Sequence, residues 1–167
     1  ATSAVHQHLV KRGLRTSAGL IVSTGSAREV HHFALLGGYG AEAIHPWLAL
    51  ETLCDMAQGD AAKAEKYTKN FTKAIGKGLM KVMSKMGVSA VQSYHGAQLF
   101  EAVGLRQDLV DQHFTWTASR IGGIGMEVVA REALLRHQAA FTERQLPGQA
   151  LPPGGQYQWR ADGEHHL

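Results

Sequence analysis

Hydrophobic and polar residues recur along this chain with the periods of both helices and strands. Residues 61–86 carry the longest helical pattern, because their apolar side chains return every three to four positions on one side. Similar patterns predict shorter helices over residues 2–12, 26–36, 47–57, 96–103, 107–113 and 126–138. Compact apolar runs predict buried strands over residues 18–23, 41–45 and 88–94.

The alternation of strands and helices decides the predicted fold class. Strands separated by helices are typical of a parallel sheet with crossover helices. We therefore predict an α/β fold over residues 1–140, with a small, mostly parallel sheet of three to four strands flanked by helices. Three strands are few for an independent domain, so we expect part of the sheet to be missing. Residues 141–167 hold three of the four prolines and are predicted to form an irregular, extended arm.

Local chemistry predicts where several helices begin or bend. Ser26 and Glu29 have the spacing of a capping box, in which a hydroxyl and a carboxylate satisfy free backbone N–H groups. Asp60 is predicted to cap the long helix. Gly76 and Gly78 interrupt that helix, and each costs about 1 kcal/mol relative to alanine. We expect the helix either to bend there or to pack closely against another element.

Composition excludes several classes of protein. The 167 residues carry a net charge of +3, which does not by itself indicate a nucleic-acid partner. The single cysteine, Cys54, excludes an internal disulfide, fits a reducing compartment such as the cytoplasm, and is interpreted as a small buried residue. No apolar run approaches the roughly 20 residues that span a bilayer, and we expect neither a membrane partner nor a signal peptide.

Lysines recur every four residues along the long helix, opposite its apolar side, at Lys69, Lys73, Lys77, Lys81 and Lys85. This pattern favours a solvated face or one covered by an acidic neighbour, because no nucleic-acid motif accompanies it. Binding of a polyanion remains the alternative.

Two glycine motifs and the histidines carry little chemistry. Residues 38–43, GYGAEA, match the letters of a dinucleotide fingerprint, but a helix precedes them and a strand follows, which inverts the required order. They are interpreted as a helix cap and a turn. Residues 121–125, IGGIG, are interpreted as a flexible turn before a helix. The ten histidines show no spacing typical of a metal site.

The best local candidate for a site is the predicted strand-to-helix turn formed by Ser93, Tyr94, His95 and Gly96. Ligands of open α/β sheets bind beyond the carboxyl ends of the strands. Two hydroxyls and an imidazole converge there, and glycine permits close approach of a backbone. A ligand contact and a purely structural capping turn are both consistent with this pattern.

Four ungapped segments, in order, together resemble one family. GLRTSAGLIVSTGSAREVHHFALLGGYGAEAIHPWLALETL and GLMKVMSKMGVSAVQSYHGAQLFEAVGL resemble consecutive stretches of the large subunit of glutamate synthase. FTWTASRIGGIGMEVVAREALLRH and GGQYQWRADGEHHL resemble later stretches of the same subunit, so that the resemblance covers essentially the whole chain.

The resemblance implies a place in a larger enzyme. Glutamate synthase makes two glutamates from glutamine and 2-oxoglutarate, with electrons from NAD(P)H or reduced ferredoxin. Its large subunit joins an amidotransferase domain, a central α/β domain, an FMN barrel with an iron–sulfur cluster, and a β-helix. This chain resembles the late central domain and the linker towards the FMN domain, which implies a structural connector. The implied partners are the amidotransferase and FMN domains and a small reductase subunit or ferredoxin.

No catalytic, cofactor-binding or metal-ligating residue of the family has a counterpart in this chain. The resemblance therefore implies that FMN and the iron–sulfur cluster belong to the parent enzyme, and that the isolated segment is inactive. The alternative function is a free-standing α/β binding domain with its ligand at Ser93–Gly96. Two departures affect local structure: His95 stands where the family usually has arginine, and Trp116 where it commonly has glycine.

Overall fold

The computed structural model describes residues 1–141 and residue 151. The predicted arm over 141–167 lies outside the described residues, apart from Phe141 and Leu151. The described part contains seven α-helices: α1 (Thr2–Lys11), α2 (Val30–Gly38), α3 (Trp47–Met56), α4 (Ala61–Lys85), α5 (Val91–Tyr94), α6 (Gln107–His113) and α7 (Met126–Ala140). It also contains four strands: β1 (Ile21–Ser23), β2 (Ala43–His45), β3 (Glu101–Leu105) and β4 (Ala118–Ile124).

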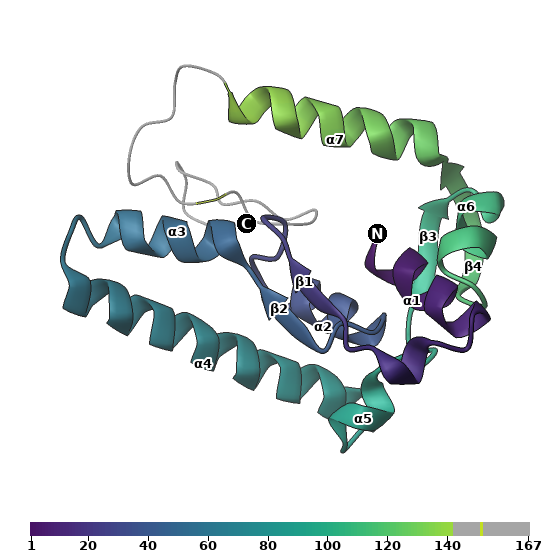
Figure 1. Ribbon diagram of the computed structural model, residues 1–167, viewed down its shortest axis with the longest axis horizontal. Coiled ribbons are helices and arrows are strands. Elements are labelled where there is room, and N and C mark those ends of the chain that lie inside the picture. Colours follow the sequence, from purple (N-terminus) through teal and green to yellow (C-terminus); the bar gives the residue numbers. More distant parts are fainter. Residues whose placement is uncertain (142–150, 152–167) are drawn as a thin grey trace, which may run out of the picture.

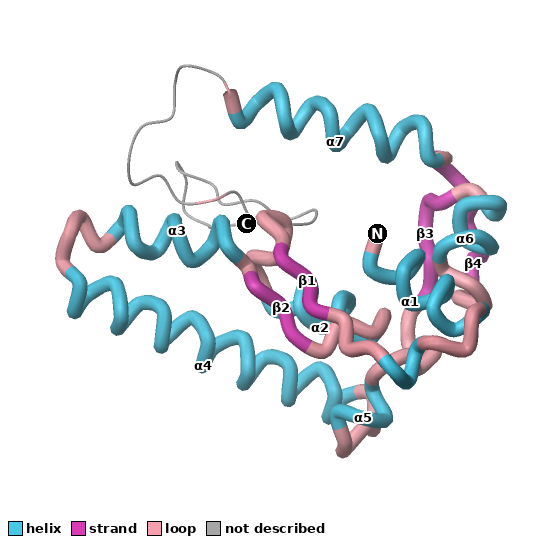
Figure 2. Tube along the Cα trace, in the orientation of Figure 1, coloured by secondary structure: helices cyan, strands magenta, loops and turns pink. Residues whose placement is uncertain are grey.

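The predicted α/β class is confirmed, and all the strand pairs are parallel. In the described residues, however, the strands form two separate sheets, β1–β2 and β3–β4, where one sheet was expected. Figure 2 shows the two pairs well apart, with α2 beside the first pair and α6 beside the second. The chain passes from one sheet to the other through α3, α4, α5 and the segment before β3.

Helices α3 and α4 form a helical hairpin along one side of the molecule (Figure 1). Asp60 caps α4 as predicted, because its carboxylate accepts a hydrogen bond of 3.0 Å from the backbone N–H of Lys63. The apolar side of α4 packs on α2 and α3. An edge-to-face contact between Phe33 of α2 and Phe71 of α4 lies in this layer.

The two glycines of α4 differ in their surroundings. A Cβ on Gly78 would overlap with the side chain of Val30, so this glycine permits the close approach of α2. Nothing lies within 4 Å of the corresponding position on Gly76. The expected close packing is therefore found at Gly78.

The region from 88 to 105 folds differently from its prediction. Residues 91–94 form the short helix α5 where a strand was predicted over 88–94, and residues 101–105 form strand β3 where a helix was predicted over 96–103. Apolar runs of this length fit a strand or a buried helix equally well, so periodicity does not separate them. The tertiary partners decide, because Ser93–Gly96 contacts the end of α2 and β3 pairs with β4.

Strand β4 includes residues 121–124, the first four residues of the IGGIG segment that was interpreted as a turn. The sequence pattern did not predict this strand because it contains glycines, which are depleted in strands. A Cβ on Gly123 would overlap with the carbonyl of Gly104 on β3, so the close approach of these two strands requires glycine. The register of the pair shifts on both sides of Val103, which indicates a bulged ladder.

Two smaller predictions are wrong. The Ser26–Glu29 capping box does not form, because α2 begins at Val30 and no side chain caps it. The backbone N–H of Ser26 instead binds the Thr24 hydroxyl. Cys54 is exposed on α3, where we expected it to be buried, since α4 packs on the other side of that helix.

Trp116 has a left-handed backbone, with φ of 66°, and its side chain is 82% exposed. Only glycine adopts this conformation freely, and other residues cost about 1–2 kcal/mol there. The glycine that is common at this place in the resembled family is therefore the residue that the turn between α6 and β4 favours.

We predict opposite effects of alanine at the two glycines of α4. Gly76→Ala raises the free energy of unfolding by about 0.8–1.0 kcal/mol, because alanine has the higher helix propensity and space is free. Gly78→Ala lowers it by about 1 kcal/mol, because overlap with Val30 outweighs the same propensity gain. Urea denaturation of the two variants and the parent chain measures both. A stabilised Gly78→Ala variant would show that α2 and α4 are not in close contact there.

Candidate functional site

Helix α2 ends in a glycine-rich turn that satisfies its own carbonyl groups. Gly40 has φ of 102°, its N–H donates to the carbonyl of Gly37, and the N–H of Ala41 donates to that of Leu36, both at 3.0 Å. These paired bonds define a Schellman motif, the common glycine-dependent end of a helix. The interpretation of GYGAEA as a cap and turn is therefore confirmed.

The predicted site at Ser93–Gly96 packs directly against this helix end. The Tyr94 hydroxyl donates to the carbonyl of Ala34 at 2.9 Å, and the Gly96 N–H donates to that of Gly38 at 2.9 Å. His95 Nδ1 lies 2.8 Å from the carbonyl oxygen of Gly37. The structure thus brings together three of the four predicted residues. Their polar groups bind backbone carbonyls in the C-terminal half of α2, and the Gly38 carbonyl is one that the helix itself leaves without a partner.

The bond from His95 places a proton on one of its ring nitrogens. A carbonyl oxygen can only accept, so Nδ1 carries a proton and donates it in this bond. Ser93 differs from its neighbours, because its side chain is exposed and its hydroxyl makes no hydrogen bond to any described residue.

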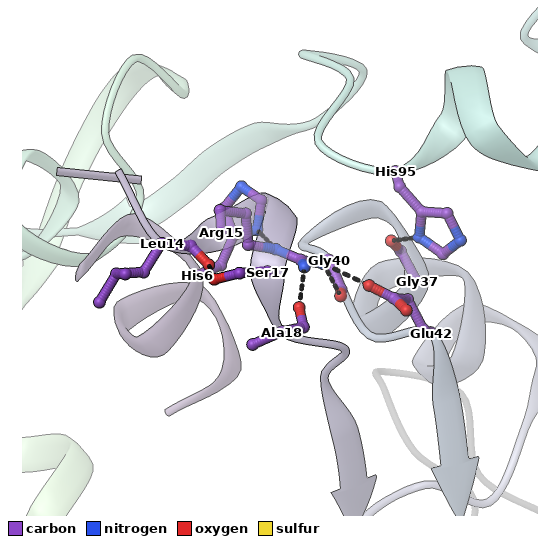
Figure 3. Close-up of polar contacts among 9 residues, drawn as sticks. All are labelled: His6, Leu14, Arg15, Ser17, Ala18, Gly37, Gly40, Glu42 and His95. Atoms are coloured by element: carbon purple, nitrogen blue, oxygen red, sulfur yellow. Dashed lines mark hydrogen bonds and ion pairs between the residues drawn. The ribbon is translucent and has the colours of Figure 1, made fainter. Parts of the chain in front are cut away.

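Arg15 ties a third segment to the same helix end (Figure 3). It lies just after α1, and its guanidinium donates to the carbonyls of Ala18 at 2.7 Å and Gly40 at 3.0 Å. It also donates to His6 Nδ1 at 3.0 Å and forms an ion pair of 2.8 Å with Glu42. Four groups from separate parts of the first 42 residues are therefore held by one side chain.

Sequence reasoning missed His6, Arg15 and Glu42. They belong to α1, to the turn after it and to the residue before β2, and no motif or periodicity connects these places. The only sequence signal is indirect, because a glycine cap such as Gly40 exposes carbonyls that a nearby cation can bind.

We use the term junction for the end of α2 together with Arg15, His6, Glu42 and Tyr94–Gly96. Electrostatics favour one set of charges at this junction. The hydrogen bond from Arg15 lowers the pKa of Glu42, which keeps this carboxylate ionised. Burial lowers the pKa of His6, and the charge of Arg15 lowers it further. Burial also raises the pKa of Tyr94, which stays a phenol. The folded state thus favours a neutral His6 beside a charged Arg15–Glu42 pair.

A cavity of about 340 Å³ opens beside the junction. It lies between α1, the end of α2 and the turn that contains Trp116, and the lining includes His6, Gln98 and Phe100. On the cavity wall the hydroxyls of Tyr39 and Thr117 are hydrogen bonded at 2.8 Å, and the Tyr39 ring stacks on Phe100. Aromatic packing and hydrogen bonds to the backbone dominate this region, so its interactions hold chain segments together.

Within residues 1–141 and 151, no three histidine, cysteine, aspartate or glutamate side chains form a group that could hold a metal ion. None of the helices in the same described part is both long and apolar enough to cross a membrane.

Comparison with known proteins identifies the family. A family model described as the glutamate synthase central domain matches residues 1–106. The chain belongs to this family. It is 50% identical to the glutamate synthase [NADPH] large chain of Bacillus subtilis (strain 168), with 99% of this chain and 11% of that protein covered. It is 40% identical to glutamate synthase [NADH] of Saccharomyces cerevisiae, with 100% of this chain and 8% of that protein covered.

A ferredoxin-dependent glutamate synthase 1 of Arabidopsis thaliana is 43% identical, with 99% of this chain and 11% of that protein covered. The chain thus spans about a tenth of the length of these glutamate synthase relatives. The central domain model ends at Arg106, so it includes every residue of the junction, whereas α6, β4 and α7 follow it.

We predict that the Tyr94 hydroxyl stabilises the junction. Tyr94→Phe removes the donor to the Ala34 carbonyl and lowers the free energy of unfolding by about 1–2 kcal/mol, since both groups are buried. Tyr67→Phe on α4 is the matched control, because the Tyr67 hydroxyl binds no described residue, and it changes stability by less than about 0.5 kcal/mol. Chemical denaturation measures both. Equal effects of the two substitutions would contradict this role of Tyr94.

We also predict a pH dependence that comes from His6. Because its folded pKa lies below the ordinary 6.5, the unfolded chain binds the proton first as the pH falls. Stability is complete above about pH 6.5 and decreases below it, until the folded pKa is passed. His6→Asn offers an acceptor close to the Nδ1 position and does not titrate, so the melting temperature of this variant decreases less between pH 7 and 5. Parallel curves for the parent and the variant would exclude His6 as the cause.

Proposed function

We propose that this chain is the segment of a glutamate synthase large chain that connects an amidotransferase domain with an FMN-binding synthase domain. Residues 1–140 form the late central domain, and residues 141–167 continue towards the FMN domain. Membership of the family supports the assignment to a glutamate synthase. The chain covers only about a tenth of the length of its relatives, which supports the assignment to a segment of it. The parent would convert glutamine and 2-oxoglutarate into two glutamates in the cytoplasm.

The observation that carries the connector role is an apolar surface on β3, β4 and α7. Val103 and Ile121 pair across the β3–β4 sheet, and their side chains are 66% and 59% exposed. Helix α7 has no buried residue and exposes Leu134 and Leu135, and it runs from β4 along the side of the molecule opposite α4 (Figure 1). Parallel strands are normally covered on both faces, and large exposed apolar patches mark contact surfaces. Another domain of the parent chain covers this surface in our proposal.

The junction supplies the rigidity that a connector needs. It joins the turn after α1, the end of α2 and the segment that leads to β3, so both sheets are anchored to one helix end. In the parent enzyme, ammonia released from glutamine passes inside the protein to the synthase site. Small errors of position between two sites can cost about 100-fold in rate, so holding the domains in register contributes to catalysis.

Cofactors and reductants belong to other parts of the parent in this proposal. An iron–sulfur cluster needs several cysteine ligands, and this chain has one cysteine. Relatives named for NADPH, NADH and ferredoxin are 40–50% identical to the chain, so the segment is not expected to select the electron donor. A small reductase subunit or ferredoxin would bind elsewhere, and the isolated segment would be inactive.

The alternative, a free-standing binding domain with a ligand at Ser93–Gly96, remains a prediction. Tyr94 OH, His95 Nδ1 and the Gly96 N–H are already bonded to α2, so a ligand would meet only Ser93 and His95 Nε2. We therefore favour the connector.

Replacing Arg15 in the full-length enzyme tests this function. Arg15→Met removes four hydrogen bonds of the junction and keeps the length of the side chain. We expect glutamine hydrolysis and ammonia-dependent glutamate formation each to stay within about twofold of the parent enzyme. The number of glutamates formed per glutamine consumed falls from two towards one, and ammonia appears in solution, because the sites are no longer held in register.

The matched control is Arg12→Met, which removes an exposed arginine just after α1 that has no ion pair in the described residues. It should keep the ratio at two. If Arg15→Met lowers the melting temperature and the ratio also stays at two, the junction does not couple the two reactions.

A further inference from the structure

One helix carries almost all the lysines of the chain. Seven of the eight lysines lie on α4, accompanied by a single acidic residue, Glu65. At 3.6 residues per turn the seven positions fall within an arc of about 160°. The opposite side packs on α2 and α3, so this lysine face points away from the molecule: Lys63, Lys66, Lys69, Lys73, Lys77, Lys81 and Lys85.

The charges of the lysine face are largely uncompensated. Lys69 forms an exposed ion pair of 2.6 Å with Glu65, and the Lys63 ammonium lies over the Tyr67 ring. In the part of the chain that the structure describes, no carboxylate forms an ion pair with Lys73, Lys77 or Lys81. Like charges four residues apart on a helix repel one another, so this row is unfavourable unless something outside the described residues lies against it.

The remaining sequence has the opposite net charge. Outside α4 it holds ten basic residues against thirteen acidic ones, although the whole chain is at +3. The net positive charge of the chain thus comes from α4. The face contains no arginine, the residue that suits bidentate phosphate binding, and the Phe71 ring is turned inward against Phe33. These features favour a carboxylate-rich partner over a nucleic acid.

We infer that the lysine face of α4 is the docking surface for an acidic surface on another domain of the same longer polypeptide. This inference rests on the proposed connector function, in which further domains surround the chain. Complementary charge is the argument for the partner, and the nine-tenths of the relatives' length that lies outside the chain is the argument for its source. Lysine suits such a contact, because its hydrated point charge on a flexible stem pairs with carboxylates without being buried.

Zero-length cross-linking of the full-length protein with a carbodiimide tests this inference. The reagent joins a lysine amine only to a carboxylate in direct contact. At low salt we expect Lys73, Lys77 and Lys81 to be joined to aspartate or glutamate residues outside 1–167 of the same polypeptide. In about 1 M salt the cross-link yield should fall at least tenfold, because charges then attract each other only over about 3 Å. Exposed Lys11 on α1 is the internal reference and should give no such product.

Two variants of the full-length protein sharpen the test. Lys73→Gln/Lys77→Gln/Lys81→Gln should abolish the cross-links from these three positions and raise the acetylation rate of Lys69 and Lys85 at least threefold, because the covering domain is released. Lys11→Gln/Arg12→Gln removes two positive charges from exposed positions at the end of α1 and should leave both readouts unchanged.

Three outcomes would overturn the docking surface. The first is that Lys73, Lys77 and Lys81 give no cross-links beyond residue 167 or before residue 1 at low salt. The second is a cross-link yield that 1 M salt does not lower, which indicates packing without charge attraction. The third is that duplex DNA or vesicles rich in phosphatidylserine bind the full-length protein through these lysines and displace the cross-links. The ratio of glutamate to glutamine measured with Arg15→Met is independent, so the connector and the docking surface can fail separately.

Discussion

The carbonyl groups at the end of helix α2 need hydrogen-bond partners, and this requirement brings both halves of the chain together. A helix leaves its last four carbonyls without partners inside the helix. Here three are satisfied locally, since Leu35, Leu36 and Gly37 accept from Tyr39, Ala41 and Gly40. The carbonyl of Gly38 accepts from Gly96, and Gly37 accepts a second bond from His95; both donors lie almost 60 residues later. Completing one short helix therefore determines where the second half of the chain begins.

This constraint explains why the strands are divided between two sheets. Residues 93–96 would have to extend alongside β1 or β2 to enlarge the first sheet, but they turn instead to bond the end of α2. The chain then continues into β3, which pairs with β4. Arg15 reinforces the arrangement from the other side, because it holds the Gly40 carbonyl and Glu42 together. His6 takes part only as a neutral acceptor, which makes this end of α2 sensitive to acid.

The outer surface is divided into a charged side and an apolar side. Lysines of α4 face outward on one side, while β3, β4 and α7 present valine, isoleucine and leucine on the other. A small domain that was surrounded by solvent would cover its parallel strands and would mix positive and negative charges over its surface. Both features agree with a segment that is surrounded by further domains, as membership of the glutamate synthase family leads us to propose.

Local patterns in the sequence and its unbroken resemblance to one family predicted the family, the fold class, the long amphipathic helix with its Asp60 cap, and the glycine cap after α2. Each of these depends on neighbouring residues or on an unbroken match. The tertiary structure, in contrast, was needed to establish that residues 91–94 are helical and 101–105 are a strand, because apolar runs of this length fit either form until their partners are known. It also decided that Arg15, His6 and Glu42 meet Tyr94–Gly96 at one helix end. The hydrogen bonds that join them connect residues far apart in the chain, and no local pattern encodes such distances.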